Sequence, residues 1–173
     1  MANNKKPRKQ YKPKAKMLNP HDYVLDNLKT LSEYDPGYIT NIQIRAHSAL
    51  TVLIQGKALP VDMDVLAASY NIVLGLCHVV ALPEPAKSSF NRVLRGALNT
   101  IQALCDRGKT LGRITVRAEE ITALNDLINL HDQILNVVTV KQFEAGMKIA
   151  LADVKSTHPK GKYHEIETNF QNA

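Results

Sequence analysis

The sequence has no tryptophan, and tyrosine and phenylalanine together make up only 5% of its 173 residues. Proteins that hold single-stranded nucleic acid by stacking its bases need aromatic side chains, so this scarcity argues against that class. No run of 18 or more apolar residues occurs, which predicts that no segment spans a membrane. The basic N-terminus lacks the apolar core of a secretory signal, so we expect a cytoplasmic protein.

Signatures of catalysis and of metal binding are also missing. Cys77 and Cys105 form no ligand pair and are predicted to be reduced thiols. The segment 108–110 resembles the end of a phosphate-binding loop, but the upstream glycine and the preceding strand are absent. The adjacent acids Glu119 and Glu120 are placed to interact with a helix dipole. We therefore predict a protein that is not an enzyme and needs no cofactor or metal.

Negative charge is missing from the first 17 residues, which contain two prolines and almost nothing apolar. This segment carries seven basic side chains: Lys5, Lys6, Arg8, Lys9, Lys12, Lys14 and Lys16. The other 156 residues hold 15 basic and 16 acidic side chains, a net charge of −1. Such a composition cannot bury enough apolar surface to offset the entropy of ordering. Residues 1–17 are therefore predicted to be a flexible basic arm.

A second basic segment, 92–117, lies inside the remainder and contains Asp106 as its single acid. Its basic residues are Arg92, Arg95, Arg107, Lys109, Arg113 and Arg117. A basic helix face beside a tight loop can follow a phosphate backbone. The alternative is an ordinary solvated helix face, on which arginine is expected.

Apolar residues recur at helical spacing, which predicts an all-α bundle of five to six helices joined by short loops. The expected helices are 22–34, 40–55, 60–82, 86–107, 117–137 and 139–155. Residues 109–116 have β character and are predicted to form a short β-like loop. The helical domain would cover 18–155, and 156–173 would be a flexible polar tail.

Several helix boundaries carry local signals. Residues 35–37, Asp-Pro-Gly, form a turn that should end the first helix. Thr40 with Gln43 and Thr139 with Gln142 have capping-box spacing, which predicts two helix starts.

Two further features concern the third and fourth helices. The run 72–82 is almost wholly apolar, which is typical of a buried central helix. Gly108 is expected to end the fourth helix.

Three histidines, His47, His78 and His131, lie on helices rich in apolar residues. No two of them have metal-ligand spacing on one helix, so a zinc or pH-sensing site is disfavoured. We expect neutral core or interface histidines with hydrogen-bond partners. Asp132 directly follows His131, and neighbouring side chains on a helix diverge, so no dyad is predicted.

Four groups of residues carry a resemblance to known proteins. They are KKPRKQYKPKAKMLNP at 5–20, HSAL with QGKA at 47–50 and 55–58, RG with GR at 107–108 and 112–113, and LN with LHD at 124–125 and 130–132. Together they resemble a group of small proteins carried by phages and plasmids of proteobacteria. The resemblance implies a cytoplasmic accessory protein of a mobile element, and it assigns no functional residues.

The charge pattern favours a non-catalytic protein that binds nucleic acid, DNA or RNA, with little sequence preference. The arm would supply long-range attraction, and the segment 92–117 would supply a fixed contact. One alternative is an adaptor or inhibitor that binds a host protein, with the arm on an acidic partner. Another is a structural homo-oligomer in which the helix containing 72–82 packs between subunits.

Overall fold

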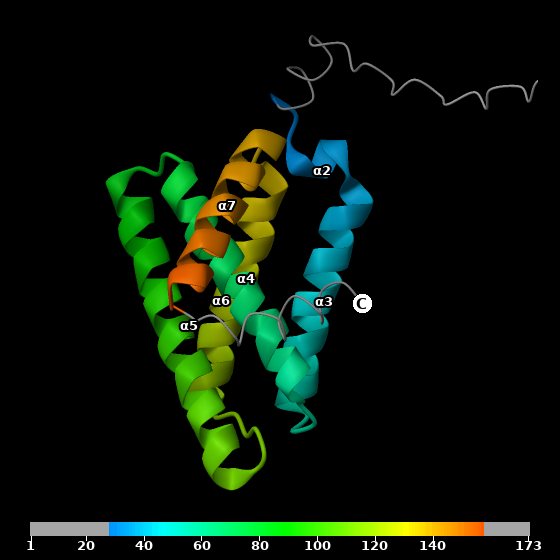
Figure 1. Cartoon of the computed structure of the whole chain (residues 1–173), viewed down its shortest axis with the longest axis vertical. Coiled ribbons are helices and arrows are strands. Elements are labelled where there is room, and N and C mark those ends of the chain that lie inside the picture. The colour runs from blue at the N-terminus through cyan, green and yellow to red at the C-terminus, as the bar shows by residue number, and fades with distance from the viewer. Residues whose placement is uncertain (1–27, 158–173) are drawn as a thin grey trace, which may run out of the picture.

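A computed structural model describes residues 28–157, which form a bundle of six helices (Figure 1). The helices are α2 (Leu31–Tyr34), α3 (Pro36–Ile54), α4 (Pro60–Val79), α5 (Glu84–Leu111), α6 (Ala118–Val137) and α7 (Val140–Thr157). The predicted all-α fold is therefore confirmed. The predicted arm, 1–17, and residues 158–173 of the predicted tail lie outside the described residues, whereas 156 and 157 belong to α7.

Helix α4 is the centre of the bundle and contacts α3, α5, α6 and α7. Its side chains Leu66, Val73 and Leu76 are fully buried. Within the apolar run 72–82 only Val73, Gly75 and Leu76 are buried, so the predicted burial holds for one side of the run and not for all of it. In Figure 1, α3 and α5 lie at opposite edges with the other long helices between them. An 18-residue window of α4 has mean hydropathy 1.2, enough by length and composition to cross a membrane. The core helix of a bundle has the same composition.

Helices α4 and α7 touch through their backbones at Gly75 and Gly146. A Cβ atom on Gly75 would collide with the carbonyl oxygen of Gly146. A Cβ atom on Gly146 would lie 2.7 Å from Cδ2 of Leu76. Both positions therefore require the absence of a side chain, and the close approach lets α7 cover the core.

Helix α3 begins earlier than its sequence predicts. Asp35 separates α2 from α3, and its carboxylate accepts a hydrogen bond of 2.9 Å from the N–H of Tyr38. Pro36 is the first helical residue, a position that needs no N–H donor. The predicted cap at Thr40 was wrong, because its hydroxyl donates instead to the Pro36 carbonyl. The Asp-Pro-Gly segment thus ends one helix and starts the next.

The second predicted capping box is confirmed at the start of α7. The Thr139 N–H donates to Oε1 of Gln142 at 3.0 Å, and the Gln142 N–H donates to the Thr139 hydroxyl at 3.2 Å. Thr139 also forms an isolated antiparallel bridge with Thr30. The start of α7 is thereby joined to the segment before α2.

Helix α5 is longer than predicted and runs through Gly108 to Leu111. It stops at Gly112, whose φ of 66° lies in the left-handed region that favours glycine. Residues 109–111 of the predicted β-like loop therefore complete the helix, and 112–117 form a loop. Gly108 can stay in the helix because its backbone bonds continue there, at a modest cost in helix propensity.

We expect Gly75→Ala and Gly146→Ala each to lower the free energy of unfolding by about 1–3 kcal/mol, because the added methyl group forces two helices apart. Urea denaturation measures this effect. The matched control is Gly96→Ala on α5, where a Cβ atom would lie 3.9 Å from Ala123. That change should be neutral or stabilise by up to about 1 kcal/mol. Equal stability of all three variants would contradict the close crossing.

Candidate functional site

The outer, solvent-facing side of α5 carries the first two basic residues of the predicted segment 92–117. Helix α5 packs on α4 and α6, and Arg92 and Arg95 are exposed. These two arginines share a hollow of about 470 Å³ with polar neighbours. The hollow is lined by Ser88, Asn91, Arg92, Arg95, Gly96 and Asn99. The structure therefore brings two of the predicted cations together with neutral hydrogen-bonding groups.

The C-terminal end of α5 and the loop that follows it carry a separate basic group. Lys109, Arg113 and Arg117 are all exposed, and Nζ of Lys109 lies 3.7 Å from the Asp106 carboxylate. Both of those side chains are mostly in water, so this pair is weak. From Arg92 to Lys109 the helix rises about 25 Å. The exposed basic residues thus form two groups, one on α5 and one at the corner between α5 and α6, and not one continuous patch.

Arg107 does not belong to either group, because its side chain turns inward. Its guanidinium makes two hydrogen bonds to Glu120 of α6, at 3.0 and 2.5 Å. It also donates to the carbonyl of Thr115. Glu120 accepts a third hydrogen bond, of 2.8 Å, from the N–H of Arg117. The positive charge of Arg107 is therefore balanced inside the fold, where it fastens the loop 112–117.

The bond from Arg107 is the largest cause that lowers the pKa of Glu120 below its usual value, although burial opposes it. Glu120 thus remains a carboxylate, in contact with the arginine. The sequence could not separate Arg107 from the exposed arginines, because its partner lies on another helix. Glu120 was predicted to interact with the helix dipole, and the structure adds this ion pair with Arg107.

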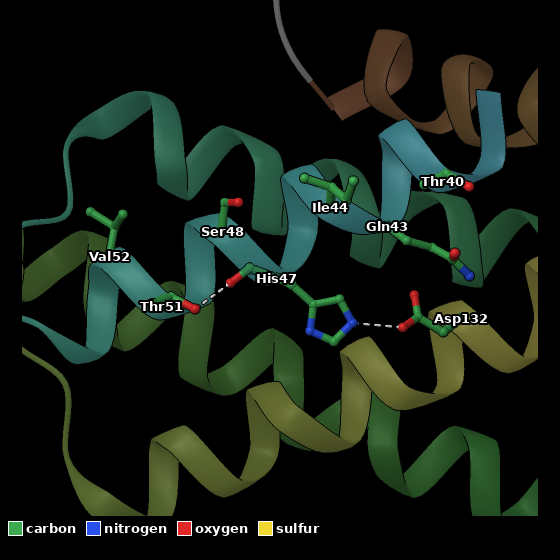
Figure 2. Close-up of a pocket in the computed structure, with 8 residues that line it drawn as sticks. All are labelled: Thr40, Gln43, Ile44, His47, Ser48, Thr51, Val52 and Asp132. Atoms are coloured by element: carbon green, nitrogen blue, oxygen red, sulfur yellow. Dashed lines mark hydrogen bonds and ion pairs between the residues drawn. The ribbon is translucent and has the colours of Figure 1, made fainter. Parts of the chain in front are cut away.

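A second cluster links α3 to α6 and was not predicted. Nε2 of His47 lies 2.7 Å from Oδ2 of Asp132, and Nδ1 of His131 lies 3.2 Å from Oδ1 of the same carboxylate. Figure 2 shows the His47 ring pointing from α3 toward Asp132 on α6. The expectation that His131 and Asp132 diverge was wrong. The carboxylate sits between the two helices, where its two oxygens reach different rings.

His131 is fully buried, and its Nε2 has no hydrogen-bond partner within residues 28–157. Burial lowers the pKa of His131, although the neighbouring Asp132 carboxylate opposes this effect. The ring is therefore held neutral, as expected for a core histidine. His47 lies at the interface of two helices, whereas His78 is exposed on α4 and not in the core as predicted.

A hollow of about 550 Å³ lies beside the His47–Asp132 pair, on the outer side of α3 (Figure 2). Its lining consists of Thr40, Gln43, Ile44, His47, Ser48, Thr51, Val52 and Asp132. The hydroxyls of Thr40 and Thr51 donate to carbonyls of their own helix, so neither donates its proton to the histidine. No group of three or more metal-ligating side chains occurs among the described residues.

No protein-family model matches the chain, and searches of curated proteins and of solved structures gave no significant match. The resemblance to phage and plasmid proteins therefore stays a prediction.

We expect Arg107→Met to lower the melting temperature by on the order of 5–10 °C, because it leaves the buried Glu120 carboxylate without its partner. The double variant R107M/E120L removes both charges and should recover most of that loss. Thermal unfolding followed by circular dichroism measures the difference. A double variant no more stable than Arg107→Met would contradict the ion pair as the cause.

We expect stability to fall as the pH drops below 6.5, the ordinary pKa of histidine. Below that pH the unfolded chain binds a proton at His131, whereas burial lowers the pKa of this residue in the folded protein and disfavours the protonated form. The limiting slope for one such proton is about 1.4 kcal/mol per pH unit. Above pH 6.5 both states are neutral at this residue, and the effect vanishes. Urea denaturation between pH 5 and pH 8 measures it.

The variant His131→Leu should flatten this pH dependence, whereas the control His78→Gln changes an exposed histidine and should keep it. Parallel pH profiles for His131→Leu and the unmodified protein would refute the assignment.

Proposed function

We propose that this protein is a non-catalytic nucleic-acid-binding protein that contacts the phosphate backbone with little sequence preference. The observation that carries the proposal is the charge distribution. Seven basic side chains and no acid occupy residues 1–17, whereas the rest of the chain has a net charge of −1. Each phosphate that such a segment neutralises releases counterions, which favours binding at low salt. The resemblance adds a role in a mobile element, in the cytoplasm.

The outer side of α5 supports this proposal with a fixed contact. No acidic residue occurs between Glu84 and Asp106, and Arg92 and Arg95 lie one helical turn apart in this interval. Serine and asparagine side chains surround them. Guanidinium groups and neutral polar groups are the usual partners of phosphate and sugar oxygens. Helix α5 would therefore position a nucleic acid that the basic arm attracts.

The host-protein alternative has its own support on α3. Ile44 and Ile54 are 56% and 48% exposed, and Ile44 lies in the hollow beside His47. A partner with an apolar helix could contact this side, while its acidic surface would meet the arm. The homo-oligomer alternative has support in the apolar run 72–82, where only Val73, Gly75 and Leu76 are buried, although α4 also contacts four helices of its own chain.

We expect removal of residues 1–17 to weaken binding to duplex DNA and to reduce its dependence on salt. Up to seven lost phosphate contacts would lower the slope of log affinity against log salt by as much as about 6. Fluorescence anisotropy of a labelled duplex between 50 and 200 mM salt measures both quantities. Truncation after Thr157 is the control, because it removes two basic and two acidic residues.

Two results would contradict the proposal. One is an unchanged salt slope after removal of residues 1–17. The other is a full-length protein that binds neither DNA nor RNA at about 50 mM salt, where phosphate contacts are strong. A protein partner retained from lysate after nuclease treatment would then favour the adaptor alternative.

A further inference from the structure

We infer that the nucleic acid bound by this protein is double-stranded, and that the outer side of α5 lies along its phosphate backbone. The inference rests on the proposed function and adds the class of nucleic acid. Three features of α5 carry it: the fixed separation of its two basic groups, the absence of aromatic groups on its outer side, and the kind of donors beside Arg92 and Arg95.

The two basic groups are held apart by a rigid element. Arg92 and Arg95 lie on the upper half of α5, and Lys109 lies about 25 Å further along the same helix. The exposed residues between them include the uncharged Asn99 and Gln102 and the acidic Asp106, which forms a weak pair with Lys109. A duplex is stiff over tens of base pairs and presents phosphates at regular positions. A single strand would have to be stretched and ordered to reach both groups, which costs conformational entropy.

The lower group is also fixed in place. Arg113 and Arg117 belong to the loop and the helix start that Arg107 and Glu120 fasten together. Among the described residues, no ion pair is formed by Arg92, Arg95 or either of these loop arginines. Their charges are therefore available to phosphates, and the backbone that carries them is held by α5 and by the Arg107–Glu120 pair.

Aromatic side chains are absent from the outer side of α5. Its one aromatic residue, Phe90, is half-buried and packs on the core. The exposed aromatic residues within the described segment are Tyr34 and Tyr38, which lie on α2 and α3 at the opposite edge of the bundle (Figure 1). Proteins that bind single strands depend on stacking between bases and aromatic rings. This side of α5 cannot provide such stacking.

The groups beside the upper arginines match a backbone and not exposed bases. Ser88, Asn91 and Asn99 are exposed around Arg92 and Arg95. Hydroxyl and carboxamide groups of this kind hydrogen-bond to phosphate and sugar oxygens, while a guanidinium can hold two phosphate oxygens at once. DNA and RNA duplexes share this chemistry, so a duplex of either kind satisfies the site.

The test compares a 24-base-pair DNA duplex, an RNA duplex of matching sequence, and one strand of each, by fluorescence anisotropy at 100 mM salt. We expect at least one duplex to bind about tenfold more tightly than its single strand. The double variant R92A/R95A should weaken duplex binding about tenfold or more and lower the salt slope by about 2. The duplex that binds more tightly indicates whether the protein prefers DNA or RNA.

The matched control is R45A/K57A, which removes two exposed positive charges on the α3 side of the bundle. It should weaken duplex binding less than about threefold, because only long-range attraction changes. Circular dichroism melting of both double variants shows that they fold.

Three outcomes overturn part of this account. Single strands that bind as tightly as duplexes refute the inference and leave the proposed function standing. Equal losses in R92A/R95A and R45A/K57A also refute it, because α5 would then contribute charge alone. A protein that binds none of the four probes, even at about 50 mM salt, refutes the proposed function itself.

Discussion

The packing of α4 against α7 is the contact on which the rest of the bundle depends. Two glycines, Gly75 and Gly146, let these helices approach until backbone meets backbone. Helix α4 can then bury side chains against four neighbours at once, and burial of apolar surface is the main source of folding free energy. The arrangement leaves α3 and α5 at the edges, each with one side turned toward solvent. Both candidate sites lie on these two outer sides.

The two outer sides differ in how their charges are balanced. On α3, His47 is paired with Asp132, and the surrounding hydroxyls of Thr40 and Thr51 bond to their own helix. On α5, Arg92 and Arg95 form no ion pair within the described chain, and their polar neighbours line a hollow. Unbalanced cations attract a polyanion, whereas a satisfied pair does not. This contrast favours α5 over α3 for the proposed nucleic-acid contact.

The sequence predicted the helices well and the contacts between them poorly. Apolar spacing located every long helix, and the Thr139–Gln142 cap was found because it involves residues three apart. Local signals failed where two of them competed: Pro36 starts α3 before Thr40 can, and Gly112 ends α5 because the helix tolerates Gly108. The Arg107–Glu120 and His47–Asp132 pairs join different helices. No periodic pattern encodes such partners, since they follow from the packing angle and register of helices.

The Arg107–Glu120 pair also gives the α5–α6 corner a defined shape. Because the same carboxylate accepts hydrogen bonds from the Arg107 guanidinium and from the N–H of Arg117, it ties the end of α5 to the start of α6. Arg107 therefore stabilises the fold, and its charge is not available to an anion in solution. The exposed Arg113 and Arg117 stand on a backbone that this pair holds in place, although the corner has one exposed charge fewer. Such a surface favours a ligand whose charges have a matching spacing.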